Sequence, residues 1–497
     1  MLSPIIILVI EHAETTGNVV YKRRIFFMKW KKVVSVMLAG VMTLSIMACG
    51  STETSSASDT TEAATQEAAA ETATEETKAA GDEKLVVWTL ANDLTDFGKR
   101  YQEQTGVTVE TVVIEPADYT TKVQTALLGG ETEPDIIVGE PQMLEDFYDA
   151  GFFEDLNQFG AQDYADQIVD YVWDVGQDAE GIQRAISYQI TPAGFYYRRD
   201  IAKTVFGTDD PAEIGKLFQD YPTILKTAQT LKDAGYRVFA SDAETNYFSG
   251  DSAWVKDDVL NVAQARYDYM DLCIELYQKD LTAYAAQWAT PWYMAMSGPV
   301  PILSAETQWG NDDLNVWDAE AFKEATAGYE TTEVFAYGLP AWGVLTMRDN
   351  VKETSGLWGV CTGPSYGFGG GTYIGVSSQS TKKEQAWEFV KFCTLNEDTA
   401  NWWIDFSEGD TVSLLSVLEQ HKDDANEVYG GEKLYSFWLE QAKGIDYSKV
   451  TRYDKAIGDA WGLAISAIKT GEKTKEDAIN EFYDVVESTY PEITVNR

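Results

Sequence analysis

Three short apolar runs decide the fold: Leu85-Val-Val-Trp-Thr-Leu90, Val107-Thr-Val-Glu-Thr-Val-Val-Ile114 and Pro134-Asp-Ile-Ile-Val138. Apolar runs of this length predict buried β-strands. Two helical patterns separate them, because an apolar face recurs over residues 94–101 and again over residues 118–128. Strand and helix in alternation predict a parallel sheet with helices on its faces, the arrangement of an α/β protein.

Polar residues follow two of these predicted strands. Asn92 and Asp93 come directly after the first strand, and Glu140 comes after the third. Ligands of open α/β sheets bind beyond the carboxyl ends of the strands. The three residues are therefore candidate ligand contacts, although Asp93 could instead cap the helix that follows it.

Composition limits the classes of function. The chain has 497 residues and a formal net charge of -42, which excludes a nucleic-acid binder that depends on basic clusters. Its only histidines are His12 and His421. Zinc sites built on several histidines are thereby excluded, and no metal or cofactor is expected. His421 lies in a polar stretch and no Gly-x-Ser-x-Gly motif accompanies it, so we expect no catalytic residue.

A targeting signal begins at Met28. Met28-Lys-Trp-Lys-Lys32 is basic, residues 33–48 are apolar or small, and Cys49 follows. This order predicts a signal peptide over residues 28–48, and residues 1–27 are interpreted as an upstream extension from a misassigned start. The sequence before Cys49 is similar to the bacterial lipobox, which implies that Cys49 is lipidated and becomes the mature N-terminus.

Residues 49–83 are almost wholly Ser, Thr, Ala and Glu, which predicts a disordered tether after the lipid anchor. The folded part is expected to begin at residue 84. It contains three further cysteines, Cys273, Cys361 and Cys393, so a single disulfide between two of them stays open.

The order of several short motifs resembles one family. They are the first strand, Tyr119-x2-Lys122-x3-Ala-Leu-x-Gly-Gly130, Ala193-Gly-Phe-Tyr-Tyr-Arg-Arg-Asp200, and Gly369-Gly-Gly-Thr-Tyr-Ile-Gly-Val376. Together they are similar to the extracellular solute-binding proteins of ABC importers, of the maltodextrin-binding type. The resemblance implies a non-catalytic, monomeric, lipid-anchored receptor on the outer face of the membrane, which delivers a sugar or oligosaccharide to ABC permease subunits.

The resemblance also implies a two-lobed periplasmic-binding-protein-like fold. Each lobe is a mainly parallel sheet flanked by helices, and the chain crosses the hinge between the lobes more than once. The first lobe is expected to comprise residues 84–190 with 366–425, and the second residues 191–365 with 426–497.

Aromatic residues supply the other candidate contacts, because flat apolar rings suit the C–H faces of sugars. Each of them could instead pack in the core, and we expect only two or three to line the cleft. The candidates are Tyr188, Trp292, Trp309, Trp342 and Tyr373.

Two alternatives remain open at this point. A surface glycoside hydrolase would use paired carboxylates, and 80 acidic residues do not exclude it, although no repeated strand-and-helix barrel pattern is found. A receptor of the same fold could instead bind a non-sugar solute such as a polyamine or a metal chelate.

Overall fold

The computed structural model describes residues 84–303, 314 and 316–497, together with the backbone of four strands near the N-terminus. The chain divides into two units, residues 1–77 and 78–497. In the first unit β1 (Ile5–Glu11) pairs antiparallel with β4 (Lys22–Met28), and β2 (Glu14–Thr15) pairs antiparallel with β3 (Asn18–Val19). Apart from Met28, the predicted signal peptide, Cys49 and the predicted tether lie outside the described residues.

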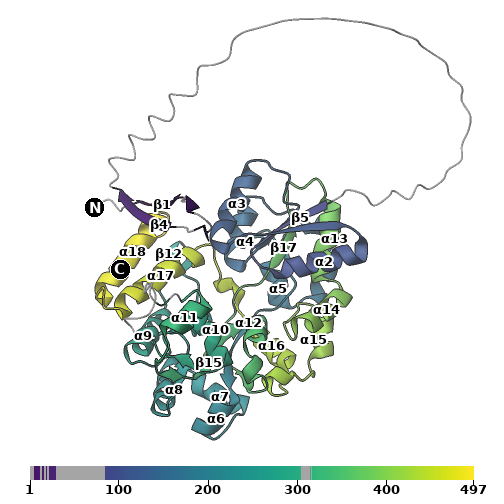
Figure 1. The fold of residues 1–497 in the computed structure, drawn as a ribbon. Coiled ribbons are helices and arrows are strands. Elements are labelled where there is room, and N and C mark those ends of the chain that lie inside the picture. Colours follow the sequence, from purple (N-terminus) through teal and green to yellow (C-terminus); the bar gives the residue numbers. More distant parts are fainter. Residues whose placement is uncertain are drawn as a thin grey trace, which may run out of the picture. The chain divides into compact units, whose positions relative to one another are not determined.

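The second unit contains a five-stranded sheet, here called the first sheet, in the order β6-β5-β7-β17-β8. Figure 1 labels two of its strands, β5 and β17. Its strands are β5 (Lys84–Thr89), β6 (Thr108–Val113), β7 (Ile136–Gly139), β8 (Ile186–Ser187) and β17 (Tyr373–Val376). β5 is parallel to both β6 and β7, whereas β17 is antiparallel to β7 and β8. The three strands predicted from apolar runs are confirmed, and so is their parallel pairing.

Helix α2 (Asp93–Thr105) shows how the sequence places helices on this sheet. Leu94, Phe97 and Tyr101 recur at helical spacing, so their side chains share one face and are buried. The helix ends where Gly106 adopts a left-handed φ of 78°, a conformation that costs a glycine little. The other helices that follow strands of the first sheet are α3 (Pro116–Leu128), α4 (Pro141–Asp149), α13 (Lys383–Thr394), α14 (Glu397–Ser407) and α15 (Leu415–His421).

The second sheet has the strand order β10-β15-β9-β16. The strands are β9 (Ala193–Arg198), β10 (Arg237–Phe239), β15 (Val334–Pro340) and β16 (Trp358–Cys361). Every residue of β9, β15 and β16 is buried, which explains why they are near-continuous apolar runs rather than alternating ones. β10 is parallel to β15, and β9 is antiparallel to both of its neighbours.

Each sheet thus has one strand that runs against all the others, β17 in the first sheet and β9 in the second. These are the strands by which the chain enters each sheet after leaving the other one. The chain passes from β8 to β9 through residues 188–192 and returns from β16 to β17 through residues 362–372. The predicted two-sheet fold with mainly parallel strand directions is confirmed, although most pairings in the second sheet are antiparallel because β9 lies in its middle.

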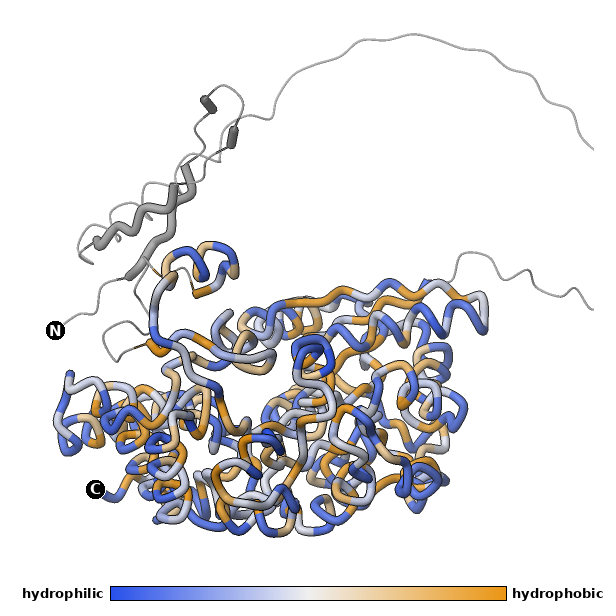
Figure 2. Tube along the Cα trace, turned by 60° about the horizontal axis from the view of Figure 1, so that its bottom comes forward, coloured by the Kyte–Doolittle hydropathy of each residue, from blue (hydrophilic) through white to orange (hydrophobic). Residues whose placement is uncertain are grey.

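The C-terminal helices pack on the second sheet's side of the molecule. α8 (Tyr221–Asp233) contacts β10, α9 (Gln264–Gln278) contacts α8, and α17 (Asp454–Lys469) contacts both α9 and α18 (Lys475–Thr489). Figure 2 shows hydrophobic and hydrophilic residues interspersed along the trace of this unit. The remaining helices are α5 (Asp170–Val175), α6 (Arg199–Phe206), α7 (Pro211–Gly215), α10 (Thr290–Ser297), α11 (Ala319–Ala325), α12 (Gly343–Asn350) and α16 (Leu434–Ala442).

The three cysteines of this unit are buried and unpaired, so the disulfide left open by their number is not formed. Cys273 instead donates its Sγ proton to the carbonyl oxygen of Asp242 over 3.3 Å. No helix in the described part of the chain is long and apolar enough to cross a membrane.

Candidate ligand-binding site

The carboxyl ends of β5 and β7 carry the polar candidates, as the strand order predicts. After β5 a tight turn forms, in which the amide of Ala91 donates to Oγ1 of Thr89 over 3.0 Å. This turn leads into Asn92 and Asp93 at the start of α2. Asn92 is exposed, and no hydrogen bond from its side chain caps the helix. After β7, half-buried Glu140 occupies the N-cap position of α4.

Asp93 is held by the segment that connects the two sheets. The Tyr188 hydroxyl donates to Oδ2 of Asp93 over 2.5 Å, and Nε2 of Gln189 donates to the same hydroxyl over 2.5 Å. Burial raises the pKa of Asp93, and the bond from Tyr188 opposes that shift. The carboxylate of Asp93 therefore accepts a hydrogen bond from the crossing segment and does not cap α2.

A second carboxyl group that the sequence did not single out lies near Asp93. Asp410 is fully buried, and its two carboxyl oxygens accept from Nε1 of Trp403 over 2.9 Å and from the amide of Thr411 over 2.8 Å. Burial, and then the charge of Asp93, raise the pKa of Asp410 to about 7. Local sequence gives no signal for this residue, because Asp93 lies more than 300 positions away.

Glu140 faces groups from the side of the second sheet. Burial raises the pKa of its carboxyl group, whereas the bond from Nε2 of Gln142, at 2.5 Å, and the charge of Lys455 lower it. The pKa of Tyr247 is raised by burial and by the charges of Glu244 and Glu140. Glu140 thus lies close enough to Tyr247 and Lys455 for their charges to interact. Glu140 follows β7 of the first sheet, whereas Lys455 lies on α17, which packs on the second sheet's side.

Aromatic rings gather on the second sheet's side. Trp342 is half-buried, and its Nε1 donates to the carbonyl oxygen of Gly369 over 2.9 Å, in the segment that returns to β17. The ring of Trp288 stacks on that of Trp342, with centroids 6.0 Å apart and an angle of 28°. Tyr247 meets Trp342 edge-on at 6.2 Å. Two of these three rings, Trp288 and Tyr247, were not among the residues singled out from the sequence.

Trp288 combines two features that set it apart. Its side chain is 39% exposed, and its backbone φ is 70°, a left-handed conformation that residues with bulky side chains rarely adopt. Such conformations persist where the surrounding structure enforces them and are concentrated at functional sites. The ring lies between Trp342 and Trp292, with a centroid distance of 4.9 Å to Trp292.

Three of the predicted aromatic contacts are buried. Tyr188 packs between Phe97 and Trp403 and reaches the site only through its hydroxyl. Trp292 is fully buried, and its Nε1 donates to Oε1 of Glu244 over 2.7 Å. Tyr373 is also buried, with 2% of its surface exposed. Trp309 lies outside the described residues.

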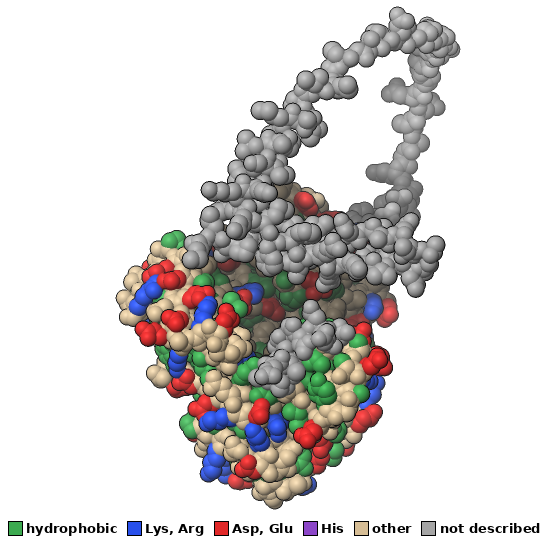
Figure 3. Space-filling view, turned by 60° about the vertical axis from the view of Figure 1, so that its left-hand side comes forward, with side chains coloured by type: hydrophobic (Ala, Val, Ile, Leu, Met, Phe, Trp, Pro, Cys, Tyr) green, Lys and Arg blue, Asp and Glu red, His purple; other side chains and the backbone are tan. Residues whose placement is uncertain are grey.

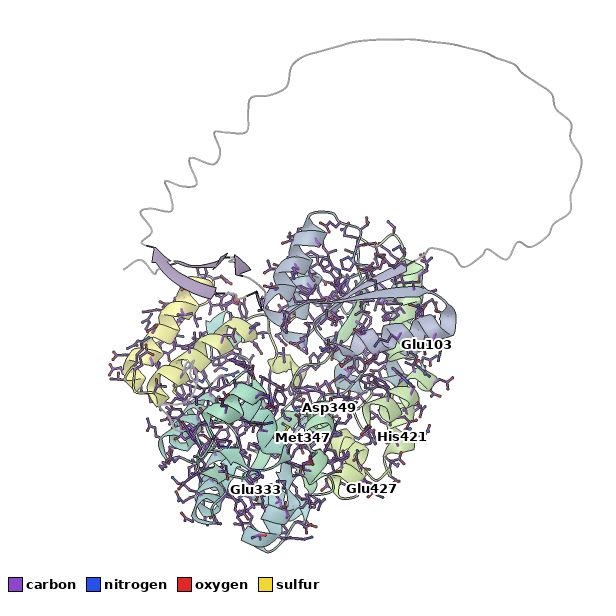
Figure 4. The ribbon with its side chains drawn as sticks, viewed as in Figure 1. Glu103, Glu333, Met347, Asp349, His421 and Glu427 are labelled. Atoms are coloured by element: carbon purple, nitrogen blue, oxygen red, sulfur yellow. The ribbon has the colours of Figure 1, made fainter. Side chains whose placement is uncertain are left out.

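α12 lies between the two groups of candidates. Figure 4 places Met347 and Asp349 of this helix in the middle of the molecule, between elements of the two sheets. Arg348, beside them, acts electrostatically on both Asp93 and Asp410, where its positive charge partly opposes the rise that burial causes in their pKa values. Figure 3 shows a hollow on the face that it displays, with hydrophobic side chains in its walls.

A surface pocket lies elsewhere, beside α8 and α9. Its lining includes Tyr221, Leu225 and Leu272 together with carboxylates such as Asp268 and Glu275. Its lining comes from the side of the second sheet and from Pro364 and Ser365 at the start of the returning segment, and no residue of the first sheet or its helices takes part. A ligand there would therefore contact only one of the two sheets' sides. The strand-end carboxylates and the Trp288–Trp342 pair are therefore the better candidate for a ligand site.

Comparison with known proteins agrees with this architecture. A family model described as bacterial extracellular solute-binding protein matches residues 96–428. The search of curated protein sequences gave no significant match. Many solved structures share the fold, and one titled extracellular solute-binding protein family 1 aligns with a TM-score of 0.63 and 18% identity, covering 82% of this chain and 99% of that one.

Two other solved structures have sugars in their titles. A solute-binding protein of an ABC transporter from Thermotoga lettingae, bound with α-D-tagatose, has a TM-score of 0.60 at 16% identity and covers 82% of this chain and 99% of its own. The binding protein from B. animalis subsp. lactis, in complex with β-1,6-galactobiose, has a TM-score of 0.60 at 15% identity and covers 83% and 99%. At these identities the likeness shows the fold.

Proposed function

Because this chain belongs to the bacterial extracellular solute-binding protein family, whose members are transport receptors rather than enzymes, we propose that it captures a sugar or oligosaccharide outside the cell and delivers it to an ABC importer. The observation that carries this proposal is a stacked tryptophan pair, exposed Trp288 and half-buried Trp342, on one sheet's side, together with strand-end carboxylates on the other. Rings of this kind pack on the C–H faces of a sugar, and carboxylates accept hydrogen bonds from its hydroxyls. The surface glycoside hydrolase is not retained.

We propose that the two lobes, residues 84–190 with 366–425 and residues 191–365 with 426–497, close on the ligand about the crossing segments. A ligand can shift the balance between open and closed forms only if it contacts the two forms differently. Asp93 and Glu140 on one side and Trp288 and Trp342 on the other would provide such contacts. The fold of the solved relatives, two of which are titled as sugar complexes, supports this arrangement.

A thermal-shift screen of the full chain tests the proposal. The panel contains mono- and oligosaccharides, linear polyamines and metal chelates, and each sugar is analysed chromatographically after incubation. We expect one class of sugar to raise the melting temperature and to be recovered unchanged. Stabilisation by amines or chelates alone would reassign the solute, and steady release of a sugar product would show an enzyme.

We also propose that Cys49 carries the lipid anchor that holds the receptor at the outer face of the membrane. The support is the basic, apolar and lipobox-like order from Met28 to Cys49. Metabolic labelling with palmitate should mark the wild type and not Cys49→Ala, whereas Cys273→Ala, which removes a buried cysteine, should stay labelled. Labelled Cys49→Ala would refute the anchor and leave the solute-binding proposal untouched.

A further inference from the structure

Arg452 connects the side of the molecule that holds the first sheet with the side that holds the second sheet. This contact lies outside the two crossing segments. Helix α4 packs against β7 of the first sheet, whereas α17 packs on α9 and α18 on the side of the second sheet. Arg452 lies just before α17, and its guanidinium reaches three carboxylates of α4. The distances are 2.9 Å to Oε1 of Glu145, 3.3 Å to Oδ1 of Asp146 and 2.5 Å to Oδ2 of Asp149.

The backbone around Arg452 also takes part in the contact, and the neighbouring residues tie it to the C-terminal helices. The amide of Arg452 donates to Oε2 of Glu145 over 3.0 Å, so both the main chain and the side chain bind α4. The next residue, Tyr453, packs edge-on against Tyr490 with centroids 4.9 Å apart. Thr451 donates to Oδ1 of Asp454 in the first turn of α17 over 2.7 Å. The contact therefore connects α4 to α17 and, through Tyr453 and Tyr490, to the end of α18.

The three carboxylates oppose the local preferences of α4. Glu145 and Asp149 are four residues apart, so like charges face each other on the helix surface, which is destabilising. Asp146 and Asp149 also lie in the C-terminal half of the helix, where its dipole disfavours negative charge. Within the part of the chain that the structure describes, Arg452 is the one cation that is ion-paired with them. These carboxylates therefore destabilise α4 locally, and a cation supplied by the other lobe offsets that cost.

We propose that Arg452 is a positioning residue, which holds the two lobes in their closed arrangement through the carboxylates of α4. The inference rests on the proposed function, because it concerns the closing motion of the same site. The three ion pairs join α4 to the residue before α17, so they break when these two helices move apart. Motions that leave the distance between the two helices unchanged leave the ion pairs intact. In this structure Glu140 and Tyr247, from opposite sides of the candidate site, lie close enough to act on each other, as expected of the closed arrangement. The three ion pairs stabilise that arrangement before any ligand binds, so the ligand has less of the closing free energy to supply.

The size of the effect follows from the exposure of the groups. The side chain of Arg452 is 27% exposed and those of the three carboxylates 49–64%, so each pair is partly screened by water. Pairs of this kind change an equilibrium by about 1.4- to 5-fold each. Loss of the guanidinium should therefore raise the ratio of open to closed molecules by about 10-fold, and salt should reproduce much of this change in the wild type.

The test measures lobe separation in the full, ligand-free chain. Spin labels are attached to cysteines introduced by Leu128→Cys on α3 and Leu463→Cys on α17, both highly exposed positions, while the native cysteines of the folded unit are buried. Arg452→Gln should increase the population at longer distance, Arg452→Lys should restore part of the short-distance population, and 1 M NaCl should shift the wild type toward Arg452→Gln. Once a sugar is identified, Arg452→Gln should weaken its binding by a similar factor.

Arg497→Gln is the matched control, because Arg497 pairs with Asp484 and Glu487 near α18, on one side of the molecule only. It should leave the distance distribution unchanged. An unchanged distribution in Arg452→Gln, or an equal shift in Arg497→Gln, would overturn the proposal. Since these distances need no ligand, a failed sugar screen would count against the proposed function and not against the role of Arg452.

Discussion

The substitution Asp410→Asn should change how the stability of the protein depends on pH. Asp410 is fully buried and its pKa in the folded protein is about 7, against 3.8 as the ordinary value for aspartate. Between these two values the folded protein keeps a proton that the unfolded chain has released. A group with such a raised pKa contributes stability that is fully present below pH 4 and is lost as the pH rises through 7.

The magnitude follows from the linkage relation. Each pH unit between 5 and 7 removes about 1.4 kcal/mol of stability through this one group, so the wild type should lose about 3 kcal/mol from pH 5 to pH 8. Asparagine cannot titrate, so this contribution to the slope disappears in the variant. Asparagine also has one acceptor oxygen where Asp410 offers two, to Trp403 and Thr411, and that cost of about 1–3 kcal/mol does not depend on pH.

Urea unfolding at pH 5, 6, 7 and 8 measures the effect. The free energy of unfolding of the wild type minus that of Asp410→Asn should fall by about 3 kcal/mol across this range. Asp233→Asn, at an exposed position of α8, is the control and should run parallel to the wild type. A difference between wild type and Asp410→Asn that is the same at pH 5 and pH 8 would refute the reasoning.

Three further predictions follow from the exposure or burial of particular side chains. Trp288→Ala and Trp342→Ala should each weaken sugar binding by about 10-fold or more, measured by calorimetry, while Tyr329→Ala, an exposed ring outside the site, leaves binding unchanged. Trp292→Ala should lower the free energy of unfolding by about 3–5 kcal/mol, because the ring is fully buried; a cost below 1 kcal/mol would contradict this placement. Burial raises the pKa of the Cys273, Cys361 and Cys393 thiols, so they should react with a disulfide reagent at pH 8 only after unfolding, and rapid reaction of the native protein would be inconsistent with the structure.

Regular elements of the first sheet were predictable from the sequence because their signals are local. The strand at residues 84–89 is an apolar run, and α2 repeats Leu94, Phe97 and Tyr101 on one face. The polar residues after β5 and β7 were predictable for the same reason, since a strand's carboxyl end fixes where the next residues lie.

The distinction between buried and exposed aromatic rings was not predictable. Trp292 and Trp288 lie four residues apart, yet one is fully buried on Glu244 and the other is 39% exposed. The difference depends on a backbone turn at Trp288 with φ of 70°, which a tryptophan does not signal. Tyr373 is similar, because a ring that follows three glycines suggests an open site, whereas the neighbouring strands β7 and β8 enclose it.

The candidate site and the crossing segments share hydrogen bonds, and this explains why binding and closing would be one event. Asp93 accepts from Tyr188, in the segment that leaves the first sheet, and Trp342 donates to Gly369, in the segment that returns to it. A solute that contacts Asp93 or Trp342 would thus contact a residue that is hydrogen-bonded directly to a crossing segment. The crossing segments are the residues whose backbone would rotate on closure. Arg452, just before α17, would act on the same equilibrium through its ion pairs with Glu145 and Asp149 of α4. If the lobes close as proposed, the two crossing segments and Arg452 would bias the same two-state motion, which is the physical requirement for coupling between sites that do not touch.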